Sequence, residues 1–490
     1  MAYPVHYLKL GLSVRACRAV QNHKHIVNLG FIRYRKQSLH PVFINRRTVY
    51  YPETADSFFH RTAINRKLLM KKSLTVLSAS LLVLCLAASS VLAGGYQLNL
   101  LGQRQIAMGH TGVGMPLDIA TISLNPGGLA TIDHNAILLG SSATFISTHY
   151  RAPAPSSYTA KTDSPMRTPF SIYASYVTPV ENLRAGIGVY TPYGNALRWE
   201  EGWKYRFLLS EISLTAIFVQ PTLSYRIGDR IGLGAGFIFA YGAVNVQRDL
   251  PIDAQDDFTP MVELDGTTTA IGFNVGVHGK ITDQISFGAA YRSKIDMEIS
   301  GGDADFTAPT ALGGTFPAGN RFDSALPLPA VLSFGLGFKA TNDLRLNLDA
   351  NLTFWSAYEN LNFEFEQNPQ ALNSIGPRNY NDRWIVRIGG EYDVNDRLQL
   401  RLGGYYDPSP VDEGYLTPET PDVDRIGLSG GFGFAITPQT DFNASLLLVL
   451  SSPREQTVQD AMSAGTFGTV PVGEFVTRAW IPGISISHRF

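Results

Sequence analysis

The sequence predicts an all-β protein, a transmembrane antiparallel β-barrel of about 14 strands with an N-terminal hatch, or plug, inside its lumen. Three observations predict this fold. Hydrophobicity alternates with a period of two after residue 133, short and long connections alternate, and a glycine-rich segment precedes the first strand. We therefore expect four parts: an upstream region (1–69), a signal peptide (70–93), a hatch (94–133) and the barrel (134–490).

Charge is divided unevenly along the 490 residues. The stretch up to Ala93 contains 14 of the 40 Lys and Arg but only 2 of the 41 Asp and Glu, so the remainder has 26 basic and 39 acidic residues, a net charge of −13. An acidic body argues against a nucleic-acid partner. Both cysteines, Cys17 and Cys85, precede residue 94, and a cysteine-free body fits an oxidising compartment.

The leader has the organisation of an export signal. Met70-Lys71-Lys72 begins a basic region, Leu74 to Ala88 is mainly apolar, and Val91-Leu92-Ala93 supplies small residues for cleavage. A single membrane anchor is the alternative, but the apolar core is short for one. Residues 1–69 show no clear period, and we expect translation to begin at Met70.

The strand between Asp343 and Phe354 shows the alternation most clearly. Its even-numbered residues from Leu344 onward are apolar, and its odd-numbered residues from Arg345 to Thr353 are polar. In a soluble sandwich the apolar face would form the core. In a membrane barrel the apolar face meets lipid and the polar face lines the lumen.

Connection lengths separate these two interpretations. Six short turns alternate strictly with seven long loops, which gives 14 strands with both ends on the short-turn side, an asymmetry typical of Gram-negative outer-membrane barrels. The short turns are at 181–182, 228–229, 282–283, 341–342, 395–396 and 439–440, and the long loops are near 149–168, 192–211, 248–266, 301–328, 359–382, 407–424 and 452–478.

The chain ends on Phe490 in an amphipathic strand, a feature typical of proteins handled by the outer-membrane assembly machinery. We expect a monomer surrounded by outer-membrane lipid and lipopolysaccharide. Aromatic residues near strand ends, including Tyr225, Trp355, Tyr405 and Trp480, are candidates for interfacial girdles or for packing.

Nothing in the sequence favours catalysis. After residue 93 the histidines are His110, His134, His149, His278 and His488, which have no metal-type spacing, and neither a GxSxG nor an HExxH motif occurs. The run from Gly232 to Gly236 looks like a nucleotide loop, but its alternation within a strand favours a small-residue barrel face. We expect no enzyme activity, cofactor or metal, although a Ser–His pair formed across strands stays open.

Across residues 94–490 the chain resembles the FadL family of outer-membrane transporters for long-chain fatty acids and other hydrophobic compounds. The chain departs from the family where Gly127 replaces the Ala of an Asn-Pro-Ala motif and where Tyr205 precedes the loop arginine. The residues that carry the resemblance are Gly95 to Asn99, Asn125-Pro126, Thr191 to Gly194, Trp203, Arg206, Glu211 to Leu214, Pro327 to Pro329, Ser409 to Val411 and Pro421 to Arg425.

The resemblance implies facilitated, energy-independent diffusion. A long-chain fatty acid or other hydrophobic small molecule, such as an aromatic hydrocarbon, would be captured by outer loops, enter a luminal pocket and leave sideways after a hatch rearrangement. The resemblance further implies that Tyr96 contacts ligand, that Asn125, Pro126 and Gly127 form the hatch motif, and that the third strand, about 183–191, contains a lateral opening. Gly186 and Gly188 are candidates for the position of that opening because glycine tolerates bulges.

Loop 192–211 is the candidate capture surface. Trp203, Tyr205, Phe207 and Leu208 form a cluster suited either to ligand capture or to loop-on-loop packing. Arg206 or Arg248 is a candidate partner for a carboxylate head group, unless each is simply solvated. Asp422, Asp424 and Arg425 predict a loop ion pair rather than a cation site.

Two other functions stay open at this point. The barrel would be a structural or adhesive protein if its plug never moved, or a nonspecific porin if the plug did not fill the lumen. The sequence does not choose between fatty acid and hydrocarbon, since both need an apolar pocket.

Overall fold

The computed structural model describes residues 95–252 and 259–490. The expected upstream region (1–69) and signal peptide (70–93) lie outside the described residues. Among the described residues, no helix is long and apolar enough to span a membrane.

The described strands form one antiparallel sheet that closes into a barrel, because β1 (Ala136–Ser142) pairs with the last strand, β21 (Gly473–Arg489). Several short strands are successive pieces of one crossing, so the wall contains 14 crossings and the predicted 14-stranded barrel is confirmed. In order the crossings are β1 with β2 (Phe145–Arg151), β3 (Thr159–Lys161) with β4 (Phe170–Val177), β5 (Leu183–Arg198), β6 (Glu211–Ile227), β7 (Ile231–Asp249), β8 (Met261–Lys280), β9 (Ile285–Arg292) with β10 (Ile295–Thr307), β11 (Asn320–Leu328) with β12 (Val331–Lys339), β13 (Leu344–Thr353) with β14 (Asn360–Phe365), β15 (Ser374–Pro377) with β16 (Arg383–Asp393), β17 (Leu398–Asp407), β18 (Arg425–Thr437), β19 (Thr440–Ser451) with β20 (Arg454–Gln456), and β21.

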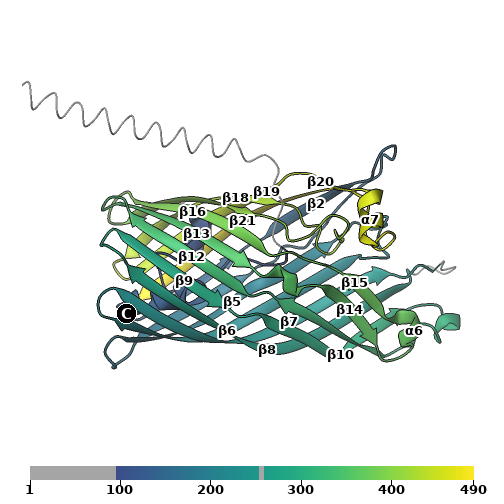
Figure 1. Ribbon diagram of the computed structural model, residues 1–490, viewed down its shortest axis with the longest axis horizontal. Helices are drawn as coiled ribbons and strands as arrows, with labels where there is room; N and C mark the ends of the chain where they lie inside the picture. The colour runs from purple at the N-terminus through teal and green to yellow at the C-terminus, as the bar shows by residue number, and fades with distance from the viewer. Residues whose placement is uncertain (1–94, 253–258) are drawn as a thin grey trace, which may run out of the picture. The chain divides into compact units, whose positions relative to one another are not determined.

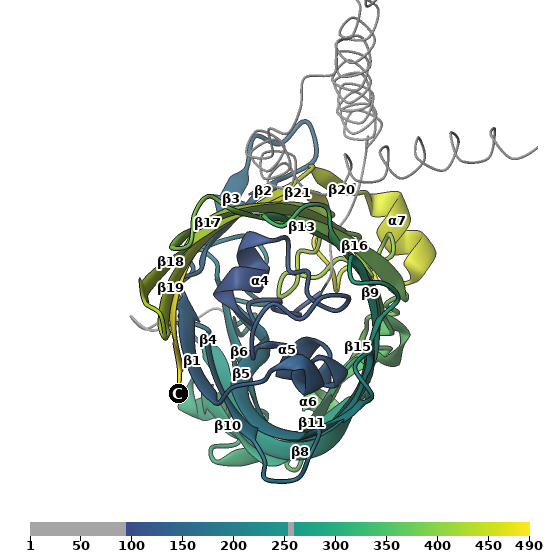
Figure 2. The ribbon, with the colours of Figure 1, turned by 90° about the vertical axis from the view of Figure 1, so that its left-hand side faces the viewer.

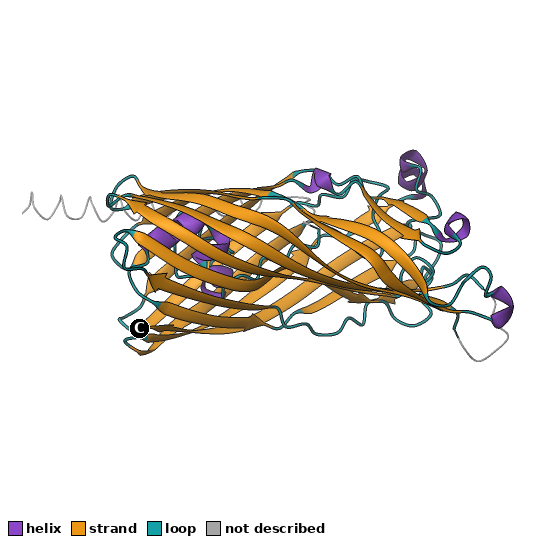
Figure 3. Ribbon diagram, turned by 90° about the horizontal axis from the view of Figure 1, so that it is seen from below, coloured by secondary structure: helices purple, strands orange, loops and turns teal. Residues whose placement is uncertain are grey.

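All six predicted short turns lie between strands of this wall and gather at the end that holds the C-terminus (Figure 1). The long connections and their helices lie at the opposite end, as the secondary-structure colours of Figure 3 show. The helical turns of these connections are η2 (Thr310–Leu312), α6 (Pro369–Leu372) and α7 (Val458–Ala464), whereas η3 (Trp355–Ala357) lies within one crossing, between β13 and β14.

The loop 407–424 has its predicted length, between β17 and β18, but other long loops are shorter than predicted. Both ends of the expected loop 248–266 belong to strands, β7 and β8, and both ends of the expected loop 301–328 belong to β10 and β11. The third crossing continues to Arg198 instead of ending near residue 191. The physical reason is that the strands stay paired beyond the lipid. There neither face has to be apolar, so apolar and polar residues no longer alternate and the sequence pattern does not mark the strand ends.

The wall is apolar outside and polar inside, as expected of a barrel in lipid. On β13 the side chains of Leu346 and Leu348 are 39% and 47% exposed, whereas those of Asn347 and Asp349 are 2% and 1% exposed. Of the aromatic residues predicted to lie in an interfacial girdle or in packing, Trp355 is fully buried inside the barrel and so is not part of a girdle. Trp480 is 51% exposed. A soluble protein would bury the leucines instead, so this pattern excludes a soluble sandwich.

Residues 95–133 fill part of the lumen. Figure 2 looks along the barrel from the short-turn end and shows α4 (Gln103–Ala107) and α5 (Thr121–Leu124) inside the ring of strands. A third helical turn, η1 (Pro126–Thr131), follows α5 and contacts β6, β7 and β8. We call residues 95–133 the luminal segment.

Glycines in the wall allow this close approach. A Cβ built on Gly234 would lie 2.2 Å from the carbonyl carbon of Pro126, and one on Gly335 would lie 2.3 Å from the backbone nitrogen of Gly114. Contacts of this kind with backbone atoms leave no room for a side chain. The glycine-rich run from Gly232 to Gly236 is therefore a small-residue face against the luminal segment, as its alternation predicted.

We expect Gly234→Ala to displace η1 from the wall, because the added methyl group overlaps the backbone at Pro126. Overpacking of this kind costs about 1–3 kcal/mol. The purified variant should unfold at a lower temperature than the unsubstituted protein at a fixed heating rate. Gly314→Ala is the matched control, since nothing lies within 4 Å of a Cβ at that loop position. Equal unfolding temperatures for Gly234→Ala and Gly314→Ala would contradict the close-packing argument.

Candidate functional site

The wall has a gap between its second and third crossings. The pairing of β4 with β5 ends at Ser171 and Tyr190, and beyond this point the two crossings meet again only at an isolated bridge between Thr162 and Trp199. On its other side, β5 has a bulge between Tyr190 and Tyr193 in its pairing with β6. Pro192 lies within the bulge, and proline has no N–H to donate to a ladder.

The gap differs in position from the predicted one. Gly186 and Gly188 lie in regular pairing with β4 and β6, so the irregularity is several residues further along β5. These glycines have a packing role. A Cβ on Gly186 would lie 2.6 Å from Cδ1 of Ile122 in the luminal segment, and one on Gly188 would lie 2.9 Å from the Tyr173 ring.

The start of the luminal segment covers the free edge of β5 at the gap. The N–H of Leu98 donates to the carbonyl of Pro192 at 2.8 Å, and the N–H of Gly194 donates to the carbonyl of Tyr96 at 3.1 Å. A bridge between Gln97 and Tyr193 lies between these bonds. The backbone of residues 96–98 thus replaces the missing ladder partner.

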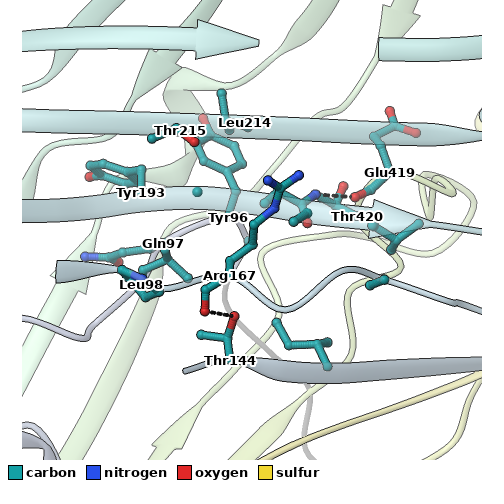
Figure 4. Close-up of a pocket in the computed structure, with 18 of the residues that line it drawn as sticks. Tyr96, Gln97, Leu98, Thr144, Arg167, Tyr193, Leu214, Thr215, Glu419 and Thr420 are labelled. Carbon is teal, nitrogen blue, oxygen red and sulfur yellow. Dashed lines mark hydrogen bonds between the residues drawn. The ribbon is translucent and has the colours of Figure 1, made fainter. Parts of the chain in front are cut away.

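A cavity of about 270 Å³, which we call the wall pocket, lies at this gap (Figure 4). Residues 95–98, the irregular stretch 164–170, β5 and the loop before β18 all contribute to its lining. Across one side, Nδ2 of Asn195 donates to the carbonyl of Glu419 at 2.5 Å.

A second cavity, which we call the apolar pocket, has a volume of about 70 Å³. The two pockets share Tyr96, Asn195, Leu214, Thr215, Glu419 and Thr420, so they are neighbours. The apolar lining comes chiefly from inward-facing residues of the long-loop halves of the strands: Ile212, Leu214, Val244, Val246, Met297, Ile299, Leu326, Leu328, Leu361 and Phe363.

Tyr96 lies where the two pockets meet, and its side chain is 4% exposed. Its ring makes edge contacts with Trp355 and Tyr358 at centroid distances of 5.0 and 5.6 Å. The Tyr96 hydroxyl donates to the carbonyl of Pro327. Figure 4 shows the ring beside Leu214 and Thr215 of β6. Tyr96, the predicted ligand contact, therefore lines both cavities.

A carboxylate fixes the start of the luminal segment beside Tyr96. Asp422 accepts the N–H of Gly95 at 2.9 Å, and Arg425 donates to the carbonyl of Gly95 at 3.1 Å. Asp422 and Arg425 form the predicted loop ion pair at 3.5 Å, and Asp424 accepts the N–H of Ser409 at 3.0 Å. Burial raises the pKa of Asp422 to about 6, against the opposing effect of Arg425.

The aromatic residues of loop 192–211 pack against one another. Trp203 is 1% exposed, stacks on Trp199 at 4.1 Å, and donates its indole N–H to the carbonyl of Leu209 at 2.7 Å. Tyr205 contacts Trp203 and Tyr150, whereas Phe207 is 36% exposed. None of Trp203, Tyr205, Phe207 and Leu208 lines either pocket. Trp203 therefore packs within the loop, as one of the two predicted alternatives has it, whereas Phe207 is the cluster member that faces outward.

The two arginines predicted to meet a carboxylate also lie away from the pocket linings. Arg206 forms an ion pair with Asp249 at 3.0 Å and contacts the Phe207 ring at 4.2 Å. Arg248 is partly buried on β7, where Glu419 influences it electrostatically. Because Arg206 is already paired with Asp249, it is a weaker candidate for binding the carboxylate head group of a ligand.

The hatch motif joins η1 to the wall. Nδ2 of Asn125 donates to the carbonyls of Val113 and Val277, both at 2.9 Å, and its Oδ1 accepts the N–H of Gly127 at 3.1 Å. A Cβ on Gly127 would lie 2.7 Å from the carbonyl oxygens of Gly232 and Gly276. Glycine rather than alanine at this position therefore follows from contact with the wall.

A buried ionic cluster holds the luminal segment at α4. Arg104 donates two hydrogen bonds, at 2.7 and 2.6 Å, to the carboxylate of Glu391, whose side chain is fully buried. Arg345 and Arg401 of the wall donate to the same carboxylate at 2.5 and 2.7 Å. Glu391 therefore keeps two cationic partners even without Arg104.

Most residues of the apolar pocket were not predicted. Alternation along the strands predicted polar inward faces, whereas the lining residues Ile212, Met297 and Leu326 are apolar and face inward. The available signal was a change of face along β6. In its long-loop half Ile212, Leu214, Ala216 and Phe218 place the apolar residues on the inward face, whereas toward the short turn Leu223 and Tyr225 place them on the lipid face.

Known proteins share this sequence pattern and fold. A long-chain fatty acid transport protein of Escherichia coli K12 is 20% identical over 459 residues, covering 86% of this chain and all of that protein. Outer membrane protein P1 of Haemophilus influenzae is 24% identical over 291 residues, a match that spans 54% of this chain and 62% of that protein.

Two crystal structures have the same fold. A FadL homologue from Pseudomonas aeruginosa superposes with a TM-score of 0.68 at 20% identity, covering 82% of this chain and all of that one. The toluene transporter TbuX of Ralstonia pickettii superposes with a TM-score of 0.60 at 18% identity, covering 80% and 100% of the two chains.

The family described as outer membrane protein transport protein (OMPP1/FadL/TodX) matches residues 84–490. That match covers the whole barrel and luminal segment, and it agrees with a barrel that is apolar outside and plugged inside. This chain belongs to that family and is a β-barrel protein of the Gram-negative outer membrane.

Proposed function

We propose that the protein carries hydrophobic small molecules across the outer membrane by facilitated diffusion. The substrates would be long-chain fatty acids or other apolar compounds such as aromatic hydrocarbons. Among the proteins named above, one is described as a long-chain fatty acid transport protein and another as a toluene transporter. One observation carries the proposal: an apolar pocket adjoins a gap in the barrel wall, and Tyr96 lines both.

The proposed route is lateral. A molecule captured among the outer loops enters the apolar pocket, passes Tyr96 and leaves through the wall pocket toward the bilayer. The polar interior near the short-turn end disfavours an apolar solute, because that solute would have to displace hydrogen-bonded groups there. The exposed surface of the wall pocket is mainly apolar, although Arg167, Glu419 and Arg425 contribute to it, and the pocket lies at the gap between strands, so lateral exit costs less.

Opening the wall pocket requires movement of the luminal segment. The backbone of residues 96–98 bonds to β5 at Pro192 and Gly194, while the Tyr96 side chain lines the apolar pocket. A ligand that displaces the Tyr96 ring therefore pulls on the bonds that cover the gap. This coupling supports a hatch rearrangement that uses only the binding energy of the ligand.

Uptake by cells is the direct test. A deletion strain should take up labelled oleate or toluene more slowly than the same strain carrying the gene. Equal uptake of every hydrophobic compound tested would favour the structural or adhesive alternative. Steady, unselective conductance of the purified protein in planar bilayers would instead support a nonspecific porin.

We expect Tyr96→Ala to slow uptake and weaken ligand binding, because it removes the ring that the two pockets share. Loss of a buried aromatic contact of this size is worth about 2–4 kcal/mol. Tyr176→Ala is the matched control, since Tyr176 is 53% exposed on β4. Binding of labelled oleate to the purified proteins measures the effect, and unchanged binding by Tyr96→Ala would remove Tyr96 from the site.

We expect Arg104→Gln to release the luminal segment more often. Glu391 stays paired with Arg345 and Arg401, so the wall keeps its charge balance while α4 loses its two charge-assisted bonds. Bonds to charged groups contribute about 1.5–3 kcal/mol, so the closed-to-open ratio should fall roughly tenfold or more.

Channel openings in planar bilayers measure this release. Openings should be rare for the unsubstituted protein and frequent for Arg104→Gln. Arg151→Gln, which removes an exposed ion pair with Glu474 at 2.9 Å, should leave their frequency unchanged. If the two variants behave alike, the ionic cluster does not hold the hatch shut.

A further inference from the structure

A third cavity lies between the luminal segment and the wall and differs in chemistry from the other two. Its volume is about 50 Å³, room for roughly three to five water molecules. We call it the arginine chamber, since Arg292 and Arg387 both line it and no carboxylate does. The other polar lining residues are Gln97, Asn99, Gln105, His110, Ser123, Asn274, Ser333, Asn351 and Thr353.

Arg292 is a buried cation without an acidic partner. Its side chain lies on β9 and is 8% exposed, and within residues 95–252 and 259–490 no carboxylate oxygen is within 4.0 Å of it. Its hydrogen bond goes to the hydroxyl of Tyr193 at 2.9 Å. The guanidinium also lies 5.2 Å from the Tyr193 ring and 6.0 Å from the Phe218 ring. Aromatic rings offset only part of the cost of burying a charge.

Arg387 faces the same chamber and is also incompletely paired. Its side chain is 3% exposed, Nε donates to Asn351 at 2.7 Å, and Nη1 has no partner among the described residues. Asp349 and Asp407 influence it electrostatically but form no ion pair with it. Oδ2 of Asp349 instead accepts N–H groups of the luminal segment. Arg387 Nη1 therefore has hydrogen-bonding capacity that no described residue uses.

Other polar atoms of the chamber lack partners within the described part of the chain. They are Oε1 of Gln105, Nδ1 of His110, Oδ1 of Asn274 and Oγ1 of Thr353. Buried polar atoms without hydrogen bonds are costly, so an occupant that bonds to them is expected. Water satisfies the neutral acceptors, but it leaves Arg292 without a counter-ion and leaves Arg387 with only Asp349 and Asp407, neither of which is within ion-pair distance.

We propose that the arginine chamber binds one small monovalent anion, or a carboxylate group of the same chemistry, against Arg292 and Arg387, with water on the remaining polar atoms. Two sources fit this chemistry: a free ion from solution, or the head group of an amphiphile whose tail lies in the neighbouring pockets. The second source has a short path, since Gln97 lines both the chamber and the wall pocket. The proposal does not rest on transport, since a protein that moves no substrate would still bind the ion.

The test uses bromide, whose anomalous X-ray scattering locates it directly. Crystals of the full chain purified in detergent, grown in sodium bromide without other ligand, should show one bromide peak in the arginine chamber. Arg292→Gln should lose that peak. Arg397→Gln is the matched control, because Arg397 is exposed in a short turn and should leave the peak unchanged. Arg387→Gln is a second variant in case Arg292→Gln does not fold, and it should lower the bromide occupancy.

Competition then separates the two sources. If oleate abolishes the bromide peak while the uncharged hydrocarbon tetradecane leaves it, the chamber receives a head group. If neither compound changes the peak, the chamber is a site for a free ion. Absence of bromide from the chamber in the unsubstituted protein would overturn the proposal, as would bromide occupancy in both arginine variants that equals the occupancy in the unsubstituted protein. Neither result depends on uptake, so failure of this inference is distinguishable from failure of the proposed function.

Discussion

Backbone hydrogen bonding in lipid is the constraint on which the rest of this structure depends. A strand in the bilayer has no water to satisfy its N–H and C=O groups, so the sheet has to close on itself. Closure through β1 and β21 provides this over most of the wall. The exception, the gap beside β5, is then informative, because the unpaired edge needs another partner.

The luminal segment supplies that partner. Leu98 and Tyr96 bond to Pro192 and Gly194, so the backbone that covers the gap belongs to residues that line the wall pocket, and one of them, Tyr96, also lines the apolar pocket. A local defect in the barrel, caused in part by a proline that cannot donate, is thereby linked to the site. Only a short stretch of backbone, residues 96–98, closes the gap, so it can separate from β5 more readily than a full-length neighbouring strand could.

The luminal segment is held by two kinds of contact. Close backbone approach at wall glycines such as Gly234 and Gly335 fixes its position through shape. Charged and amide groups fix its orientation, with Glu391 at α4 and Asn125 at η1. At Glu391 three arginines share one carboxylate, whereas no carboxylate lines the arginine chamber. Positive and negative charges are therefore balanced differently in these two parts of the barrel interior.

The amino-acid sequence by itself determined the barrel, its 14 crossings and its orientation of faces. These follow from local rules, since a period of two and the length of each connection are visible in one stretch of chain at a time. It also predicted the loop ion pair at Asp422 and the small-residue face near Gly234. The family resemblance pointed to Tyr96, whose contact with ligand stays a prediction. The sequence pattern failed at the ends of the long loops, where strands continue into water without alternation.

Only the tertiary structure decided the site. The bulge lies at Tyr190 and Tyr193 instead of the predicted glycines, because it depends on which residues of three neighbouring strands pair. Trp203 is buried in loop packing and Arg206 is paired with Asp249, contacts made by segments distant in sequence. The apolar pocket and the arginine chamber likewise arise where the luminal segment meets several strands. Each depends on the register and separation of those elements, which no single stretch of sequence specifies.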